Sequence, residues 1–130
     1  MSIEDNKTVA RKWIDAVNKK DYAAFDELMT PELAASTKKG IARAYEIWPN
    51  HHVEIVDMVA EGDQVWMKST NSADQGEEVE GIPPTGKHWS TDVIFCFRFV
   101  NGRLASTDGG VADTWSIYKQ LGATLAPPKG

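Results

Sequence analysis

Apolar and polar residues alternate along the first part of the chain with the period of an α-helix. Val9, Trp13 and Val17 fall on one stripe, and Ser2 and Asp5 precede it in the arrangement of a capping box. In a capping box each of the two side chains accepts a hydrogen bond from the other residue's backbone, which satisfies free N–H groups at a helix start. The pattern therefore predicts a first helix that begins close to Ser2.

Two more helices are predicted before residue 50. Asp21 can cap a short helix that carries Phe25 and closes at Pro31. A further stripe at helical spacing consists of Ile41, Ala44, Tyr45 and Trp48. Pro49 ends this third helix, and Gly40 leaves its first residue open.

From His51 onward the apolar residues recur at every second position, which is the period of a β-strand. His51 and Val53 point to one side and their polar neighbours to the other. Residues 61–63 predict a turn into a second strand over about 64–71. The polar, acidic stretch 72–80 is typical of a strand end or a loop.

The longest strand is predicted over about 88–100, where β-branched and aromatic residues dominate. Asn101-Gly102 follows it, and this dipeptide favours the type I′ hairpin turn, which needs a positive φ at both central residues. A fourth strand then starts at Arg103 and is interrupted at Gly109-Gly110.

Asp113 can cap a last helix, which Gly122 ends. Its apolar positions are Trp115, Tyr118 and Leu121. Helices followed by an antiparallel sheet are the α+β pattern, with the helices packed on one sheet face. We expect residues 1–130 to form one such domain, since 130 residues suffice for a single core and not for two.

Composition and charge narrow the function classes. The net charge is −5 and no basic run is present, so neither nucleic acid nor an anionic membrane is an expected partner. The single cysteine, Cys96, cannot form an internal disulfide and fits a reducing compartment. The first residues lack the apolar stretch of a signal peptide, and no segment has membrane-spanning length. We therefore expect a cytoplasmic protein.

The segment GIPPTGKH, residues 81–88, comes close to a phosphate-binding loop and fails on chemistry. Such a loop uses successive backbone N–H groups and a following helix, whereas Pro83 and Pro84 remove two donors and a strand follows. His88 also replaces the hydroxyl residue that would bind a metal. The segment is predicted to be a rigid connection between strands, with Ile82 packed on the core near a cavity mouth.

Strand alternation indicates which side chains face the helices. The inward set is apolar apart from a few polar groups, and it includes His51, Met67, Ser69, Asn71, Thr91, Val93, Phe95 and Phe97. This make-up is typical of a site for a hydrophobic small molecule. The outer face shows Trp66, Ile94 and Cys96, which is too apolar for open water, so we expect a homodimer packed sheet to sheet.

The order of the predicted elements is accompanied by four short motifs, AEGDQVWMK, GIPPTGK, FRFVNGRL and D-x-x-x-x-x-x-Q-L-G, and together they extend over most of the chain, from Asn6 to Gly122. Together they resemble the SnoaL-like polyketide cyclase branch of the nuclear-transport-factor-two-like superfamily. The resemblance implies a cone-shaped α+β barrel, in which a curved antiparallel sheet wraps around a helix over a deep apolar pocket. It also implies a general acid/base aspartate, matched here by Asp113, for an intramolecular aldol closure.

The chain departs from the family pattern in three places. The segment from Pro31 to Gly40 is shorter than usual and carries neither aspartate nor histidine. Gln75 stands where a histidine is common before the GIP loop, and Asp108 with a Gly-Gly pair stands where a tryptophan is common. These changes leave the fold resemblance in place and weaken the specific aldol reaction.

Each candidate catalytic residue has a structural alternative. Asp113 can transfer protons if partly buried, or it can simply cap the last helix. Asp108 can share acid and base roles with it, or lie exposed in a turn. His51 can be the proton partner of Asp113, or a core histidine. Trp13, Tyr45 and Trp48 can form the helical wall of the cavity, or ordinary core.

The sequence thus predicts a small enzyme that moves a proton on a hydrophobic, polyketide-like carbonyl compound in cyclisation, isomerisation or elimination. We expect no cofactor for this chemistry. We also expect no metal, because the adjacent residues His51 and His52 point to opposite faces of a strand. The alternatives are a non-catalytic protein that binds an apolar ligand on the same scaffold, and a dimerisation module with a vestigial pocket.

Overall fold

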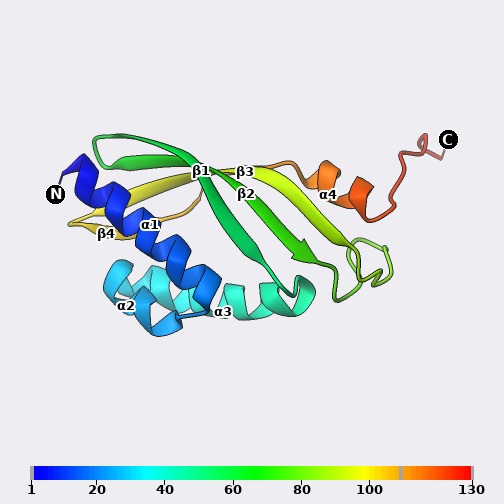
Figure 1. Cartoon of the computed structure of the whole chain (residues 1–130), viewed down its shortest axis with the longest axis horizontal. Coiled ribbons are helices and arrows are strands. Elements are labelled where there is room, and N and C mark those ends of the chain that lie inside the picture. The colour runs from blue at the N-terminus through cyan, green and yellow to red at the C-terminus, as the bar shows by residue number, and fades with distance from the viewer. Residues whose placement is uncertain (1, 109, 130) are drawn as a thin grey trace.

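The computed structural model describes residues 2–108 and 110–129. The helical half contains α1 (Ile3–Lys19), the 3-10 turn η1 (Tyr22–Ala24), α2 (Phe25–Leu28) and α3 (Pro31–Ile47). The remainder contains β1 (His52–Glu61), β2 (Gln64–Asp74), β3 (His88–Val100), β4 (Arg103–Ser106), β5 (Val111–Ala112) and α4 (Thr114–Gln120). Figure 1 shows α2 and α3 below the long, twisted strands, α1 running obliquely from the N-terminal end of the sheet down to them, and α4 at the far end of the sheet.

The sheet is antiparallel and open, in the order β1-β2-β3-β4, and β5 pairs with β3 on the same side as β4. The predicted α+β class is therefore confirmed. β4 and β5 are two pieces of one edge, and Gly110 lies between them against β3. A Cβ atom on Gly110 would come within 2.6 Å of the Ile94 carbonyl oxygen, so glycine is required there. Gly109, the other half of the predicted interruption, lies outside the described residues.

Side-chain amides close both edges of the sheet. Asn18 donates to the Val53 carbonyl oxygen and accepts from the Val53 N–H, both at 2.8 Å. Gln120 of α4 likewise donates to the Ser90 carbonyl oxygen of β3 at 2.9 Å and accepts from the Ser90 N–H at 3.0 Å. Because unpaired strand edges invite pairing with other chains, these two amides protect the sheet at its most open points.

Most predicted boundaries are confirmed, and two are wrong. The hairpin residues Asn101 and Gly102 have φ of 51° and 78°, as a type I′ turn requires. β2 runs on to Asp74, three residues beyond its predicted end. Pro31 does not close a helix; it is the first residue of α3, which also includes the segment 31–40. Proline suits that position because its missing N–H would have no partner in the first turn.

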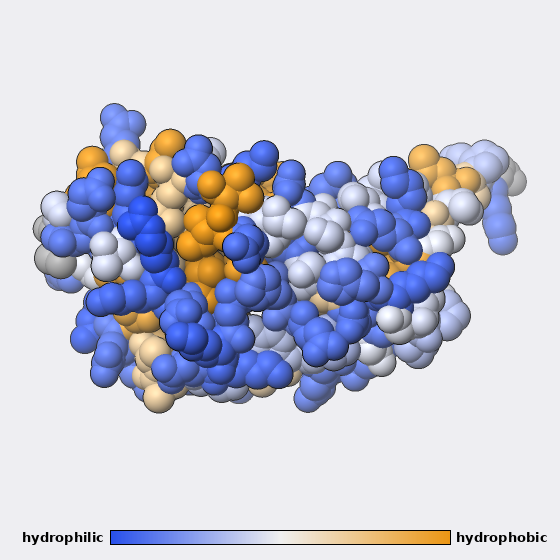
Figure 2. Space-filling model, in the orientation of Figure 1, coloured by the Kyte–Doolittle hydropathy of each residue, from blue (hydrophilic) through white to orange (hydrophobic). Residues whose placement is uncertain are grey.

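Buried apolar side chains form two clusters. The first cluster lies between the sheet and α1–α3 and consists of Ala10, Trp13, Ile14, Ala16, Val17, Phe25, Met29, Ala34, Val53, Val65, Met67, Phe97, Phe99 and Leu104. The second cluster consists of Ala73, Trp89, Ile117 and Leu121, with Trp48, Ile82 and Tyr118 packed against it. Figure 2 shows a mostly polar surface on which hydrophobic atoms gather in a strip beside α1.

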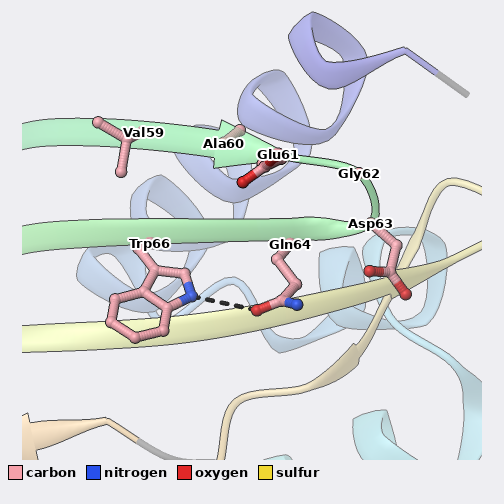
Figure 3. A pocket seen from close by; sticks show the side chains of 7 residues that line it. All are labelled: Val59, Ala60, Glu61, Gly62, Asp63, Gln64 and Trp66. Carbon is pink, nitrogen blue, oxygen red and sulfur yellow. Dashed lines mark hydrogen bonds between the residues drawn. The ribbon is translucent and has the colours of Figure 1, made fainter.

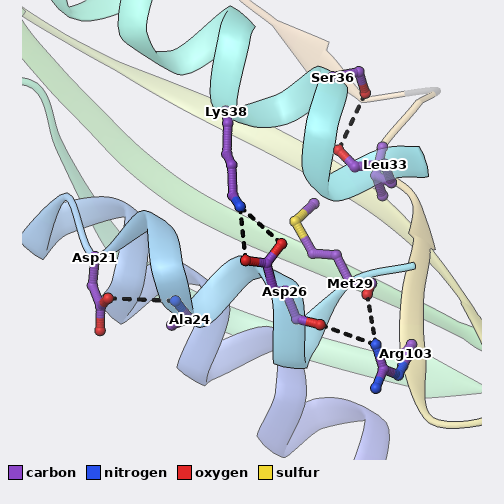
Figure 4. A network of polar contacts seen from close by, with 8 residues as sticks. All are labelled: Asp21, Ala24, Asp26, Met29, Leu33, Ser36, Lys38 and Arg103. Atoms are coloured by element: carbon purple, nitrogen blue, oxygen red, sulfur yellow. Dashed lines mark hydrogen bonds and ion pairs between the residues drawn. The ribbon is translucent and has the colours of Figure 1, made fainter. Parts of the chain in front are cut away.

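A polar network joins α2, α3 and β4 beside the first cluster (Figure 4). The guanidinium of Arg103 donates to the carbonyl oxygens of Asp26 at 3.0 Å and Met29 at 3.3 Å. The Asp26 carboxylate also accepts from Lys38 at 2.8 Å. These bonds satisfy carbonyl groups at the end of α2 that the helix itself leaves free.

Among residues 2–108 and 110–129, no helix is long and apolar enough to span a membrane.

Candidate functional site

The inner face of the sheet carries a polar island between the two clusters, defined as His51, Ser69, Asn71 and Thr91. Ser69, Asn71 and Thr91 are at most 8% exposed, so they are as buried as the apolar residues around them. The Ser69 hydroxyl donates to Oδ1 of Asn71 at 2.6 Å, which leaves the amide nitrogen of Asn71 as the group that can donate further. The predicted inward direction of these side chains is confirmed.

Strand register brings the island together. Asn71 lies opposite Val53 on one side and Thr91 on the other. The next row of inward side chains contains Ser69 and Val93. Residues far apart in sequence therefore meet on one patch of the inner face, which only the pairing of three strands can place.

His51 joins the island from the residue before β1. Its ring lies edge-on to Tyr45 of α3, with the ring centres 5.5 Å apart. Its Nδ1 atom is buried and has no hydrogen-bond partner in the described part of the chain. Burial lowers the pKa of His51, with a smaller contribution from His52, so the imidazole is neutral near pH 7. A neutral imidazole can accept a proton.

Tyr45 is fixed over this group by its own contacts. Its hydroxyl donates to the Val17 carbonyl oxygen at 2.7 Å, and Lys20 lies 4.9 Å from its ring centre. Burial, assisted by Tyr22, raises the pKa of Tyr45 to about 12, so it stays protonated. Tyr45 thus forms a fixed wall at this position, since its single O–H proton is already donated to Val17.

The aromatic candidates divide between the clusters. Met67 and Phe97 are fully buried in the first cluster, and Trp13 packs edge-on against Phe95 and Phe97. These residues form continuous core, which for Trp13 is the alternative to a cavity wall. Val93 and Phe95 face the same way and are only partly buried, so the inner face is least covered along the middle of β3.

The GIPPTGKH segment has an organiser that sequence reasoning missed. Gln75 is 2% exposed, and its amide donates to the carbonyl oxygens of Glu77 and Ile82. Its Oε1 atom accepts from the backbone N–H and the hydroxyl of Thr85. The segment connects two strands, and Ile82 packs on the second cluster, both as predicted. The available sequence signal for Gln75 was an amide side chain shortly before a proline-rich loop.

Both candidate carboxylates are exposed. Asp113 caps α4, since its Oδ1 accepts from the Ser116 backbone N–H at 3.0 Å. Asp108 lies in the turn after β4, where its own N–H donates to the Ser106 hydroxyl. Of the two alternatives for Asp113, the structure has the helix cap and not the partial burial, because α4 is short and leaves its first turn open. Asp113 still follows Ala112, which pairs with Val93 in the same row as Ser69.

An open recess of about 530 Å³ lies on the opposite, outer face of the sheet (Figure 3). It is lined by Val59, Ala60, Glu61, Gly62, Asp63, Gln64 and Trp66. The Trp66 indole donates to Gln64 at 3.3 Å, and its ring is half-exposed. This recess is distinct from the predicted inner pocket, because Trp66 alternates with the buried residues Val65 and Met67.

Within the described residues, no group of three or more His, Cys, Asp or Glu side chains is placed to hold a metal ion.

Comparison with known proteins gives one family and many similar folds. The profile of the family described as SnoaL-like polyketide cyclase matches residues 7–121. No curated protein matches the sequence significantly. TsrD from Streptomyces laurentii shares the fold with a TM-score of 0.82 and 21% identity, over 95% of this chain and 99% of that one.

Two further structures show how widely this fold is used. A SnoaL-like polyketide cyclase from Agrobacterium tumefaciens has a TM-score of 0.78 at 11% identity, over 94% of this chain and 100% of its own. AclR from Streptomyces galilaeus, a proposed hydroxylase, has a TM-score of 0.78 at 22% identity, over 98% of this chain and 87% of its own. At such identities the likeness establishes the fold alone.

Proposed function

The chain belongs to the SnoaL-like polyketide cyclase family, and we propose that it is a cofactor-independent enzyme acting on a hydrophobic carbonyl compound. The observation that carries this proposal is the polar island, a set of buried hydrogen-bonding groups enclosed by apolar clusters on the inner sheet face. Buried polar groups inside an apolar wall are the usual means of orienting a small substrate. The substrate is held with its reacting carbon over the island.

The reaction is proton transfer next to the carbonyl group. Neutral His51 accepts the proton from the carbon, Asn71 and Thr91 orient the substrate, and a buried N–H donor of the inner face holds the oxygen as negative charge develops there. Asp113 is the second acid/base group, and it directly follows Ala112, the last residue of the row that contains Ser69 and Val93. The resulting enolate then cyclises, isomerises or expels a leaving group.

One specific observation favours a second candidate function. Asp108 and Asp113 are both exposed, and one carboxylate oxygen of Asp113 is already used in capping α4. A protein that only binds an apolar carbonyl compound would need the island and neither aspartate. The two functions therefore differ in whether proton transfer takes place after binding.

Hydrogen–deuterium exchange at carbon distinguishes them. Benzoylacetone is incubated in D₂O with catalytic amounts of protein, and loss of its α-proton signal is followed by NMR. We expect catalysed exchange that falls at least tenfold in His51→Gln and in Asp113→Asn, because general acid–base catalysis typically contributes about 10²–10⁴-fold. The exposed Glu27→Gln serves as the control and keeps the wild-type rate. Binding without exchange supports the second function, and exchange that survives both substitutions refutes the assigned residues.

The outer sheet face supports a homodimer. Val56, Val59 and Trp66 are 56%, 64% and 50% exposed and lie on one face of neighbouring strands. Large apolar side chains gathered on one sheet face are typical of protein interfaces. A second copy packed with its own outer face against this one would cover them. Sedimentation at micromolar concentration tests this: Trp66→Lys should yield monomers from a dimer, and a wild-type monomer would contradict the proposal.

A further inference from the structure

Two of the three buried side-chain nitrogen atoms that lack a partner among the described residues belong to one row of the inner sheet face; the third is Nε1 of Trp13. The Nε1 atom of Trp89 and the Nδ1 atom of His51 are both buried, and neither has a hydrogen-bond partner in the described residues. Trp89 is 4% exposed, so its indole N–H has no access to bulk water. Native proteins pair nearly all buried polar groups, and each exception calls for an explanation.

The middle residue of the row that holds these atoms is small. Ala73 pairs with Trp89, and His51 lies opposite Ala73 because it directly precedes the His52–Ser72 pair. Two strand spacings separate the backbones of His51 and Trp89, which is about 10 Å. Between them Ala73 contributes only a methyl group, so the two larger side chains stand on either side of a small one.

Aromatic rings from the C-terminal end of α3 and its cap residue Trp48 frame this row. Tyr45 lies edge-on to His51, and Trp48 lies edge-on to Trp89 with ring centres 5.3 Å apart and planes at 81°. Tyr45 and Trp48 are three residues apart and therefore neighbours on the helix surface. The row thus combines an apolar aromatic frame with one fixed N–H donor and one imidazole nitrogen.

We propose that Trp89 is a binding residue whose indole N–H holds the carbonyl oxygen of the ligand in the row His51–Ala73–Trp89. An indole N–H can only donate, so it selects a ligand with an acceptor oxygen at this end. His51 faces the same ligand from the other end of the row and exchanges the proton. This inference rests on the proposed function and deepens it, since it names an aromatic ketone as the ligand class and Trp89 as the residue that recognises its oxygen.

Matched ligands test the hydrogen bond directly. Acetophenone and α-methylstyrene have nearly the same shape, but only the ketone can accept from an N–H group. In ¹⁵N-labelled protein we expect the Trp89 indole resonance to shift downfield with acetophenone and to move far less with α-methylstyrene. Wild-type protein should bind the ketone about threefold to tenfold more tightly than the hydrocarbon, the range for a net hydrogen bond.

A pair of variants assigns the preference to Trp89. Trp89→Phe keeps a ring in the second cluster and removes the N–H, so it should bind the two ligands equally. Trp115→Phe makes the same change on the exposed face of α4 and should keep the ketone preference. A ketone preference that persists in Trp89→Phe would overturn the proposal.

The resonance measurement uses the unchanged protein, so it decides the matter even where Trp89→Phe fails to fold. A Trp89 N–H held by a buried water would exchange magnetisation with water and stay in place when acetophenone is added, which also overturns the proposal. Failure here is distinct from failure of the proposed function. Deuterium exchange that depends on His51, without any ketone contact at Trp89, would keep the proton-transfer enzyme and remove only this residue.

Discussion

The two apolar clusters are built by different means. The first cluster is formed mainly by long regular elements, α1 and the sheet, whose apolar residues recur at helical or strand spacing, and α2 and α3 add fewer buried residues. The second is formed by strand ends, the seven-residue helix α4 and the loop around Ile82. It depends on single side-chain amides, Gln75 for the loop and Gln120 for α4. Stability is therefore concentrated in the first cluster, and the second can vary in shape at lower cost.

Truncating a large apolar side chain in each cluster should separate the two clusters most strongly. Phe97 is fully buried among aromatic rings, so Phe97→Ala should lower the free energy of unfolding by about 3–5 kcal/mol. Leu121→Ala, in the smaller second cluster, should lower it by about 2 kcal/mol, since that site can collapse more easily. Urea unfolding measures both. Equal losses would mean that the two clusters form one cooperative core.

Removing the loop organiser should affect the second cluster alone. Gln75→Ala leaves the Thr85 N–H and the Glu77 and Ile82 carbonyl groups without their partner, at about 1–3 kcal/mol. Hydrogen exchange should lose protection over residues 77–87 and keep it in α1. Gln64→Ala, whose side chain lies on the outer face, is the control and should change stability by less than about 0.5 kcal/mol. Loss of protection in α1 would contradict a separate second cluster.

The same contrast explains what the sequence could predict. The long strand 88–100, the Asn101-Gly102 turn and the helix caps follow from local patterns, and the structure has them as predicted. The inward and outward sets of β2 and β3 were also predictable, because alternation is a property of any strand. The residues of the first cluster could therefore be predicted almost entirely from the spacing of apolar residues along the chain.

The contacts of the second cluster could not be predicted from such spacing, for physical reasons. Gln75 organises a loop through contacts up to ten residues away, and no local period marks such a residue. One feature of the helical half was also not predictable: Pro31 is compatible both with the end of one helix and with the first turn of the next, and only packing decides between them. The exposure of Asp113 depends on how much of α4 and β5 covers it, which is a tertiary property.

Asp113 offers a smaller test at the edge of the second cluster. Asp113→Ala removes the acceptor for the Ser116 N–H and should cost about 1 kcal/mol, the usual value for a lost cap. Asp113→Ser keeps a capping oxygen and should retain nearly full stability. Thermal unfolding checks both variants, and equal melting temperatures for the two would show that the cap adds nothing. Catalytic loss in Asp113→Ser with full stability would separate the acid/base role from the cap.

The effect of pH on His51 gives the finest test, because it probes the island that separates the clusters. Burial lowers the pKa of His51 in the folded protein, so the unfolded chain takes up this proton first as the pH falls. Stability should be fully present above the ordinary histidine pKa of about 6.5, decline below it, and level off once the pH passes the lowered folded pKa. His51→Gln, which cannot titrate, should remove this part of the decline. The remaining histidines, His52 and His88, contact carboxylates at the surface and stay common to both proteins, so the difference between the two stability curves isolates His51. A difference curve that is flat between pH 7 and 5 would mean that the imidazole is hydrated in solution, and the island would then be open to water from its β1 end.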